Sequence, residues 1–488
     1  MKRSIVVRLF ACLTAFLPYL AAQGQVSTFT RWFGGPKYDE AFCVQALANG
    51  GFVIAGTSLT LTGSFEEVFA IRLDCAGDTV WVRTVGGRGH DDGFSICQTF
   101  DGGFAIAGTK SSSARDTVSA YVVKLDSAGT LEWTNKLRYS LKDLASSVCE
   151  TRDSGLAIAG VMGSGPHGRS DARLMKMNRD GDTLWTRTYG GAADDGLLSI
   201  LSLPDGGFLL TGYTNSLGAG AFDCLVIRTD ELGDTLWTRT YGGPDDETGW
   251  SADTTDDSCF VIGGVLTHGI PPSGSAQFFL VKVQGDGDTV WTRTIDGATS
   301  DSRFSVRHTG DGGFAFVGTT PTSGREEDAL LVKTDRWGEA QWRRTFGTQS
   351  FDKGSSVQQC QDGGFIVAGM VSENTYDAYL VKTDEQGLIA GMNGGTETGR
   401  PKLFHLSQNY PNPFNPVTSF QFTIDKCQLT ILKVYDLLGQ EVATLVNEVK
   451  QPGDYSVRFD ASTLASGIYF YRLMAGGYVA VKKLVVMK

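Results

Sequence analysis

The chain has 488 residues, of which 41% are hydrophobic and 20% are charged, and its formal net charge at pH 7 is −11. This composition predicts two or three folded domains and excludes a disordered protein. The negative charge argues against nucleic acid as a partner, because binding a phosphate backbone needs clustered Lys and Arg.

The N-terminus has the layout of a secretory signal peptide. Basic residues occur within the first eight positions, an apolar run follows from Leu9 to Ala22, and small residues precede a cut after Gly24. We therefore expect residues 1–24 to be a cleaved signal peptide, and the mature protein to be secreted or attached to the outer cell surface. No later stretch approaches the roughly 20 apolar residues of a membrane-spanning helix, so we expect no transmembrane segment in the mature chain.

The following part of the chain repeats about every 52 residues. One column of the repeat is a tryptophan and the other is a turn of the form Asp-Gly-Gly-Phe. The tryptophans are Trp32, Trp81, Trp133, Trp185, Trp237, Trp291 and Trp342, and the turns begin at Asn49, Asp101, Asp153, Asp205, Asp257, Asp311 and Asp362. Regular self-similarity of this length predicts a repeat architecture, with the tryptophans filling the space between units.

Each repeat contains four short apolar runs separated by turn residues. In the second repeat these runs are residues 94–100, 104–109, 120–125 and 131–137, and we name the four strands A, B, C and D. Asp-Gly-Gly between A and B, and a Gly three residues after Asp between C and D, supply the positive φ angles of tight hairpins. Four antiparallel strands at this spacing favour the radial blades of a β-propeller.

The two ends of the repeat region predict how the ring closes. The chain enters on a lone D-type strand at residues 30–33, whereas the last repeat stops after strand C near Gly387. The N-terminal strand should complete the last blade and cover its bare edge. We therefore predict an all-β fold with a seven-bladed β-propeller at residues 25–388, followed by a linker at 389–403.

An acidic residue stands four residues before the middle of strand A in every repeat. These residues are Asp39, Asp91, Asp143, Asp195, Glu247, Asp301 and Asp352. If strand A is innermost, the carboxylates ring the mouth of the central channel and are candidate ligand or cation sites. The alternative, which we favour, is that each carboxylate accepts backbone N–H bonds and braces the loop between strands D and A.

A basic residue ends strand C in every repeat. These residues are Arg72, Lys124, Lys176, Arg228, Lys282, Lys333 and Lys382. Most repeats have an acid five positions earlier, and odd spacing on a strand puts two side chains on opposite faces. We expect the bases to contact neighbouring blades or solvent.

No motif in the chain indicates a cofactor or a catalytic centre. H-E-x-x-H, G-x-S-x-G and zinc-type spacings of Cys and His are all missing, so we assign no catalytic residue, no metal ligand and no cofactor. The acidic turns at 178–182 and 284–288 faintly resemble calcium loops, which keeps calcium as an alternative. Cys97 and Cys149 occupy equivalent places in neighbouring repeats and are the pair to test for a disulfide.

The loops between strands B and C vary most among the repeats, and variable loops on a rigid scaffold usually carry recognition. We interpret the propeller as a non-catalytic module that binds a glycan or a surface protein. A secreted polysaccharide-active hydrolase or lyase and a structural surface component are the alternatives. A mixed cluster of Asp, His, Tyr and Arg converging once at the channel mouth would favour the enzyme, whereas a uniform ring of acids would favour the binding module.

A different module begins after the linker. Its first motif is Asn409, Tyr410, Pro411, Asn412, Pro413, Phe414, Asn415 and Pro416, in which the prolines enforce an extended entry. Alternating runs between residues 420 and 487 then predict the strands of a small Ig-like antiparallel β-sandwich.

Residues 404–488 resemble the type IX secretion system C-terminal sorting domain of Bacteroidetes and related phyla. The resemblance rests on residues 409–416, on Val-Tyr-Asp-Leu-Leu-Gly-Gln with Gly439, and on Leu-Ala-Ser-Gly with Gly467. It implies that the type IX machinery carries the protein across the outer membrane, and that the domain is commonly cleaved as the protein is released or attached to surface lipopolysaccharide. The propeller only generally resembles secreted bacterial propeller-repeat proteins, which implies no activity.

Overall fold

The computed structural model describes residues 28–61, 65–112, 117–163, 169–219, 221–268, 275–299, 303–321, 327–348, 350–372, 375–389, 405–406, 409, 412–424, 428–437, 439–450, 453–475 and 478–487. The expected signal peptide, all but the first residue of the expected linker, and Asp301, Tyr410 and Pro411 lie outside these ranges. Every element of regular secondary structure within these ranges is a β-strand, which confirms the all-β fold class.

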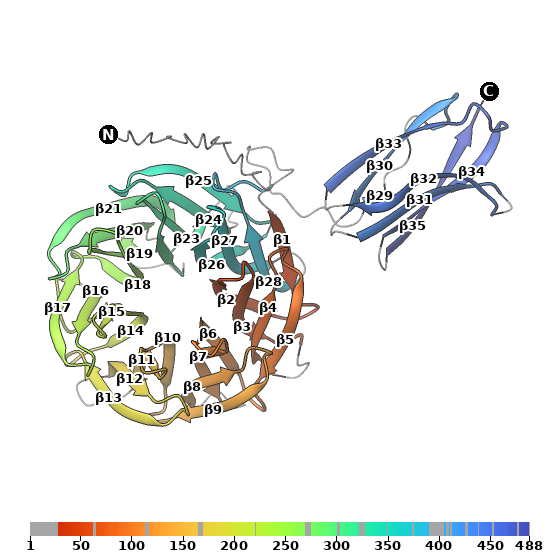
Figure 1. Ribbon diagram of the computed structural model, residues 1–488. Helices are drawn as coiled ribbons and strands as arrows, with labels where there is room; N and C mark the ends of the chain where they lie inside the picture. The colour runs from red at the N-terminus through yellow and green to blue at the C-terminus, as the bar shows by residue number, and fades with distance from the viewer. Residues whose placement is uncertain are drawn as a thin grey trace, which may run out of the picture.

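Four-stranded antiparallel sheets follow one another along the repeat region and surround a central opening, in a propeller-like arrangement (Figure 1). The first three sheets consist of β2 (Asp39–Ala46), β3 (Phe52–Ser58), β4 (Glu67–Leu73) and β5 (Thr79–Val85); β6 (Asp91–Gln98), β7 (Phe104–Ser111), β8 (Val118–Leu125) and β9 (Leu131–Leu137); and β10 (Asp143–Glu150), β11 (Leu156–Gly163), β12 (Ser170–Met177) and β13 (Thr183–Tyr189). The next three consist of β14 (Asp195–Ser202), β15 (Phe208–Thr214), β16 (Asp223–Thr229) and β17 (Thr235–Tyr241); β18 (Asp246–Thr254), β19 (Phe260–His268), β20 (Ser275–Val283) and β21 (Thr289–Ala298); and β22 (Ser305–His308), β23 (Phe314–Pro321), β24 (Glu327–Thr334) and β25 (Ala340–Phe346).

One further sheet joins the two ends of the repeat region. It consists of β26 (Asp352–Gln359), β27 (Phe365–Ser372), β28 (Tyr376–Lys382) and the N-terminal strand β1 (Phe29–Phe33). β1 runs antiparallel to β28, from Phe29 opposite Lys382 to Phe33 opposite Ala378. The N-terminal strand therefore adds the fourth strand to the three that end the repeat region.

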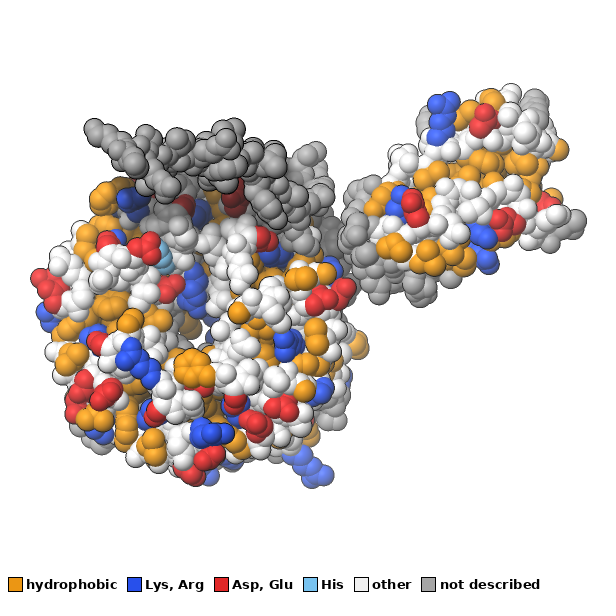
Figure 2. Space-filling model, in the orientation of Figure 1, with side chains coloured by type: hydrophobic (Ala, Val, Ile, Leu, Met, Phe, Trp, Pro, Cys, Tyr) orange, Lys and Arg blue, Asp and Glu red, His pale blue; other side chains and the backbone are white. Residues whose placement is uncertain are grey.

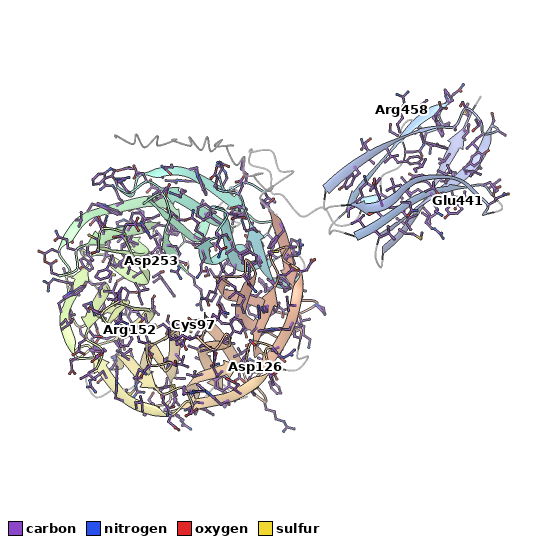
Figure 3. All side chains as sticks on the ribbon, viewed as in Figure 1. Cys97, Asp126, Arg152, Asp253, Glu441 and Arg458 are labelled. Atoms are coloured by element: carbon purple, nitrogen blue, oxygen red, sulfur yellow. The ribbon has the colours of Figure 1, made fainter. Side chains whose placement is uncertain are left out.

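Strand A of each sheet lies at the central opening and strand D lies at the rim (Figure 1). Cys97 of β6 accordingly sits beside the opening, whereas Asp126, in the turn after β8, sits toward the rim (Figure 3). Because successive strands alternate in direction, the A–B and C–D turns share one end of the ring, which we call the turn end. The D–A and B–C loops share the other end, which we call the loop end.

The core consists of apolar layers between neighbouring sheets. Val53 and Ala55 of the first sheet, for example, pack in one buried cluster with Phe104, Ile106 and Tyr121 of the second. Strands B and C are buried almost throughout, which explains why they read as continuous apolar runs in the sequence.

Polar side chains of strand A also connect neighbouring sheets. The hydroxyl of Ser95 accepts a hydrogen bond from the backbone N–H of Val148 at 3.3 Å, one sheet further along the ring. Ser356 accepts the equivalent bond from Val44 at 3.2 Å, across the place where the ring closes. These bonds satisfy backbone donors on the inner face of the sheets.

The tryptophan column packs onto the C–D turn of the next sheet. A Cβ atom built on Gly129 would lie 2.8 Å from the ring of Trp81, and Gly129 has a φ of +78°. The same contact joins Gly181 to Trp133, Gly233 to Trp185, Gly338 to Trp291 and Gly387 to Trp342. The glycine is therefore needed twice, for its backbone conformation and for the ring of the preceding sheet.

The assignment of Trp32 to the tryptophan column is wrong. Trp81 pairs with Arg72 and Trp133 pairs with Lys124, but the residue opposite Lys382 is Phe29, while Trp32 lies opposite Tyr379. Phe29 also packs onto Gly77, whose Cβ would lie 2.7 Å from its ring. The register of β1, rather than the identity of the residue, decides which side chain fills this place.

The C-terminal part consists of two antiparallel sheets around one core. The first contains β29 (His405–Leu406), β30 (Val417–Ile424) and β33 (Gly453–Asp460), and the second contains β32 (Glu441–Lys450), β31 (Gln428–Tyr435), β34 (Gly467–Ala475) and β35 (Tyr478–Val486). Phe420 and Phe422 of the first sheet share a buried cluster with Leu432, Tyr471 and Leu484 of the second.

Candidate functional site

The acidic column lies buried at the loop end. Its six described members are Asp39, Asp91, Asp143, Asp195, Glu247 and Asp352, and each is at most 6% exposed. Asp195 accepts hydrogen bonds from the backbone N–H of Gly191 in the D–A loop, at 2.8 Å, and from the hydroxyl of Ser216 in the B–C loop, at 2.7 Å. Asp39 makes the equivalent bonds to the N–H groups of Gly35, at 3.2 Å, and Thr60, at 3.4 Å. Such bonds are those that a loop brace requires.

Some of these acids meet a second carboxylate from strand C of the preceding sheet. A Cβ atom on Gly347 would lie 2.4 Å from Asp328 Oδ1 and 2.6 Å from Asp352 Oδ2, so the two carboxylates flank this glycine. Burial, with a smaller contribution from Asp328, raises the pKa of Asp352 to about 6. Burial, reinforced by Asp223, raises the pKa of Glu247 to about 7. These carboxyl groups therefore titrate closer to neutrality than ordinary surface acids.

The bases at the end of strand C bind the hairpin aspartate of their own sheet, which corrects the expectation that they face neighbouring blades or solvent. Lys176 Nζ lies 2.8 Å from Asp153 Oδ2 and also donates to the carbonyl of Met177 at 3.0 Å. The same pair forms between Lys124 and Asp101, Arg228 and Asp205, Lys282 and Asp257, Lys333 and Asp311, and Lys382 and Asp362. The A–B turn carries the aspartate back over the end of strand C, a contact that strand spacing alone does not reveal.

The first sheet is an exception, and there the base contacts the neighbouring sheet as expected. Asn49 replaces the hairpin aspartate there, and Arg72 instead donates to the carbonyl of Ser127 in the next sheet at 3.1 Å.

One mixed cluster breaks the regular pattern at the loop end. It consists of Tyr38, Glu40, Asp92 and Arg303, and we call it the mouth cluster. The hydroxyl of Tyr38 donates to Glu40 Oε2, and the hydroxyl of Thr109 donates to Asp92 Oδ2 at 3.1 Å. Glu40 and Asp92 each follow a member of the acidic column, at a position where the other repeats have Leu144, Gly196, Thr248, Ser302 and Lys353. The cluster is therefore a local addition to the repeat.

Arg303 reaches across the channel to aromatic rings of three other sheets. Its guanidinium carbon lies 4.3 Å from the ring centre of Phe42, 5.1 Å from that of Phe94 and 5.9 Å from that of Trp250. We call these three residues the aromatic wall. A guanidinium at such distances is held by attraction to the faces of the rings, so Arg303 has a fixed place within the channel.

Strand A of the sixth sheet is shorter than in the other sheets, and Arg303 precedes it. The equivalent residues of the other sheets are Ala41, Gly93, Ala145, Leu197, Gly249 and Gly354, and each pairs with a glycine of strand B. In the sixth sheet the A–B ladder begins only at Ser305, opposite Val317. Because Ala41 and Leu197 are fully buried, a guanidinium in their place would lose its water without a partner. Arg303 therefore lies outside the ladder, while Phe304 packs into the core 5.0 Å from Phe316.

Charge and burial act together in the mouth cluster. Burial raises the pKa of Asp92, and hydrogen bonds from Thr57 and Thr109 together with the charge of Arg303 oppose this shift. Burial lowers the pKa of Arg303, while Glu40, Asp92 and Tyr38 act in the opposite direction. One guanidinium thus faces two carboxylates in a half-buried place.

One pair of tyrosines and one pair of a histidine with a phenylalanine extend the mouth cluster towards the B–C loops. The rings of Tyr38 and Tyr376 are 5.6 Å apart, and Tyr376 is 42% exposed. His90 Nδ1 lies 2.7 Å from Glu66 Oε2, and the rings of His90 and Phe65 are 6.5 Å apart. The loop end therefore offers solvent-exposed aromatic surface beside charged groups.

The sequence contained a signal for this site that residue motifs did not reveal. An arginine in a column of Ala, Gly and Leu, and acids in a column that otherwise lacks them, are departures from the repeat. Such departures could have been found by listing, for each column, the one residue that cannot fill the shared structural role. The candidate ligand role of the regular acidic column stays a prediction, and its member Asp301 lies outside the described residues.

The described residues contain no group of three or more His, Cys, Asp or Glu side chains arranged to hold a metal ion. The turn at 178–182 is closed by Asn178 Oδ1, which accepts the N–H groups of Asp180 and Asp182. Cys97 and Cys149 are free thiols, so the disulfide suggested for them is not formed. They pack in two different clusters between sheets, and burial raises the pKa of Cys149 to about 12.

The sorting-motif residues hold the last strand of the chain. Asn412 Oδ1 accepts the N–H of Val485 at 2.9 Å, and Asn412 Nδ2 donates to the carbonyl of Lys483 at 3.3 Å. The backbone of Phe414 bonds to Val485 and Met487. The remaining described motif residues are Asn409, Pro413, Asn415, Pro416, Gly439 and Gly467.

Residues 408–487 match the family described as secretion system C-terminal sorting domain. The C-terminal part is therefore a type IX secretion sorting domain, as the sequence motifs predict, and the protein is exported to the outside of the cell, where it is secreted or held at the surface. Within the described residues, no helix has the length and apolar character to cross a membrane. On the face shown in Figure 2, acidic and basic side chains are interspersed around the ring.

The chain is similar to several known proteins. It is 24% identical over 278 residues to Regulatory protein FlaEY of Caulobacter vibrioides, a match that covers 50% of this chain and spans only 29% of that protein's length. Among solved structures, Sqt1 from Chaetomium thermophilum is 12% identical, with a TM-score of 0.43, 74% of this chain covered and 99% of that one. The β-propeller domain of the Trilobed protease from Pyrococcus furiosus is 8% identical, with a TM-score of 0.40, and 73% and 95% of the chains are covered. These likenesses carry no argument about function.

Proposed function

We propose that this protein is an extracellular recognition protein, delivered by the type IX secretion machinery, that binds a glycan or a surface protein at the loop end of its propeller. The chain consists of a cleaved signal peptide at residues 1–24, a seven-bladed β-propeller at 25–388, a linker at 389–403 and an Ig-like sorting domain at 404–488. The sorting domain supplies the location, and the propeller supplies the binding surface.

The observation that carries the proposal is the mouth cluster with its aromatic wall. Arg303 contacts aromatic rings of three other sheets, and no other sheet has an arginine at this position. The repeated fold therefore does not require this residue. Departures from a repeat that converge on one place are typical of a site that acts once per molecule. The variable B–C loops stand at the same end, as recognition loops on a rigid scaffold do.

A second candidate is a polysaccharide-active hydrolase or lyase, because the cluster combines carboxylates, a tyrosine and an arginine. The bond between Tyr38 and Glu40 and the raised pKa of Asp92 are features that acid–base catalysis can use. Such a mixed cluster is the feature that we expected, from the sequence, to favour an enzyme. Binding stays the first proposal because the charge of Arg303 acts on both carboxylates and its guanidinium lies against the aromatic wall, which suits fixed recognition better than proton transfer.

Incubating the purified full chain with insoluble polysaccharides and with extracellular protein fractions tests the proposal, with release of reducing ends and a chelator control. Saturable binding without new reducing ends, weakened by Arg303→Ala, supports a recognition protein. Released ends would establish the hydrolase instead. Binding that Arg303→Ala leaves intact, or self-association without any bound material, would contradict a site at the mouth cluster and favour the structural surface component.

A further inference from the structure

We propose that the mouth cluster binds a carbohydrate without net charge, with Arg303 and Asp92 as the groups that recognise its hydroxyls. This inference rests on the proposed function and assigns the ligand class. Its evidence is the balance of charge in the cluster, the hydrogen-bonding groups that the cluster presents, and the aromatic surface around it.

The balance of charge disfavours anionic ligands. The single guanidinium of Arg303 faces the carboxylates of both Glu40 and Asp92, and its electrostatic partners also include Tyr38. Glu66 adds a further carboxylate at the same end, bound to His90 at 2.7 Å. An incoming carboxylate or sulfate would meet a cation that already has two anionic neighbours, and repulsion between like charges in a half-buried place is costly.

The hydrogen-bonding groups suit a polyhydroxylated ligand. A guanidinium has five donors in a planar fork, whereas an ionised carboxylate is an acceptor only. Arg303 and Asp92, which are both half-buried, therefore supply the donor and the acceptor that adjacent hydroxyl groups need. Glu40 is 5% exposed and accepts the hydroxyl of Tyr38, so it holds the cluster from within. Hydrogen bonds to such charged groups are stronger than those between neutral groups, so a small number of them can fix the orientation of a sugar.

Aromatic surface completes the match. Tyr376 is 42% exposed and packs beside Tyr38, with 5.6 Å between the ring centres, and Trp250 and Phe94 are half-buried around Arg303. Sugars present apolar C–H faces alongside their hydroxyls, and an aromatic ring can cover such a face while a neighbouring polar group binds the edge.

The test is a panel of immobilised oligosaccharides that contains neutral, uronate-containing and sulfated members, probed with the full chain. We expect saturable binding to neutral members, weakened about tenfold or more in Arg303→Ala and in Asp92→Asn, because each loses hydrogen bonds to a charged group. Arg239 of the outer strand β17 is exposed and stands against Trp237, so Arg239→Ala is the matched control and should bind like the wild type. Arg303→Lys keeps the charge but loses the fork, and should be weakened too.

The possible outcomes separate the ligand class from the site. Binding confined to uronate-containing or sulfated members, or no binding to any oligosaccharide, overturns the neutral carbohydrate. If the ligand that is then found still depends on Arg303, the recognition site stands and only its ligand class is wrong. A ligand that binds all variants equally overturns both. Thermal unfolding of each variant identifies any loss of binding that reflects misfolding. If Arg303→Ala is misfolded, Arg303→Lys replaces it as the test of the site, because it keeps the charge and should still bind more weakly than the wild type.

Discussion

The turn end and the loop end of the propeller are made by the same strands, yet they follow different rules. At the turn end, one ion pair and one contact between an aromatic ring and a glycine recur around the ring, and even the first sheet, which has Asn49, changes its partner in a consistent way. At the loop end, a regular set of braces surrounds an irregular cluster. The comparison teaches that contacts which recur in the sheets stabilise the fold, whereas residues that depart from the repeat and converge in one place are candidates for function.

The contact between ring and glycine at the turn end should give the largest effect on stability. Gly129→Ala must place a methyl group 2.8 Å from the ring of Trp81 at a φ of +78°. Strain at positive φ and overpacking together should lower the free energy of unfolding by about 3 kcal/mol, measured in urea. Gly312 has a φ of +81° with no atom within 4 Å of its Cβ, so Gly312→Ala should show only the backbone part, about 1 kcal/mol. Equal losses would show that the tryptophan contact does not matter.

The braces at the loop end should make stability depend on pH. Because folding raises the pKa of Glu247 to about 7 and of Asp352 to about 6, their contribution is complete below about pH 4 and is lost as the pH rises through 6 to 7. Between pH 4 and pH 8, the wild type should lose about 2 kcal/mol relative to Glu247→Gln, measured by unfolding at each pH. Parallel pH profiles would contradict a carboxyl that is protonated in the folded state.

The hairpin ion pair at the turn end should have a smaller effect. Hydrogen bonds from Lys176, Thr151 and Gly155 lower the pKa of Asp153 to about 2, against the effect of burial. Asp153→Asn removes the charge beside a buried ammonium and should cost about 1 kcal/mol, because the aspartate itself is largely exposed. Asn49→Asp is the control and should change the free energy of unfolding by less than about 0.5 kcal/mol, since Arg72 is bound to Ser127. If Asn49→Asp raised the free energy of unfolding by as much as Asp153→Asn lowers it, the turn aspartate alone would be enough to form the ion pair with the base of strand C.

The regular parts of the molecule were predictable because period, turn chemistry and burial agree. The acids of strand A, the glycines of the turns and the lone N-terminal strand all carry signals that repeat or that complete a repeat. Phe29 was missed because tryptophan identity was followed instead of spacing. Each of the other tryptophans stands ten residues before an acid of strand A, as Trp81 does before Asp91, and Phe29 stands ten residues before Asp39.

The mouth cluster could not be assembled from the sequence alone. Arg303 precedes the first strand of the sixth sheet, Asp92 and Glu40 lie in the second and first sheets, and only ring closure brings them together. Single residues that break a column are also common where a loop has drifted, so a break gains meaning only when several converge in space. The pairing of Lys176 with Asp153 was missed for a related reason, because the A–B turn, rather than strand spacing, sets that contact.

The central claim is that Arg303 serves binding and not folding, and a paired measurement on Arg303→Ala tests it most directly. The substitution leaves Glu40 and Asp92 without the positive charge of Arg303. We expect the variant to stay folded, with a loss of up to about 3 kcal/mol in the free energy of unfolding, while binding of a neutral oligosaccharide falls about tenfold or more. A loss of several kcal/mol in stability with unchanged binding would contradict the claim and make Arg303 a structural part of the ring.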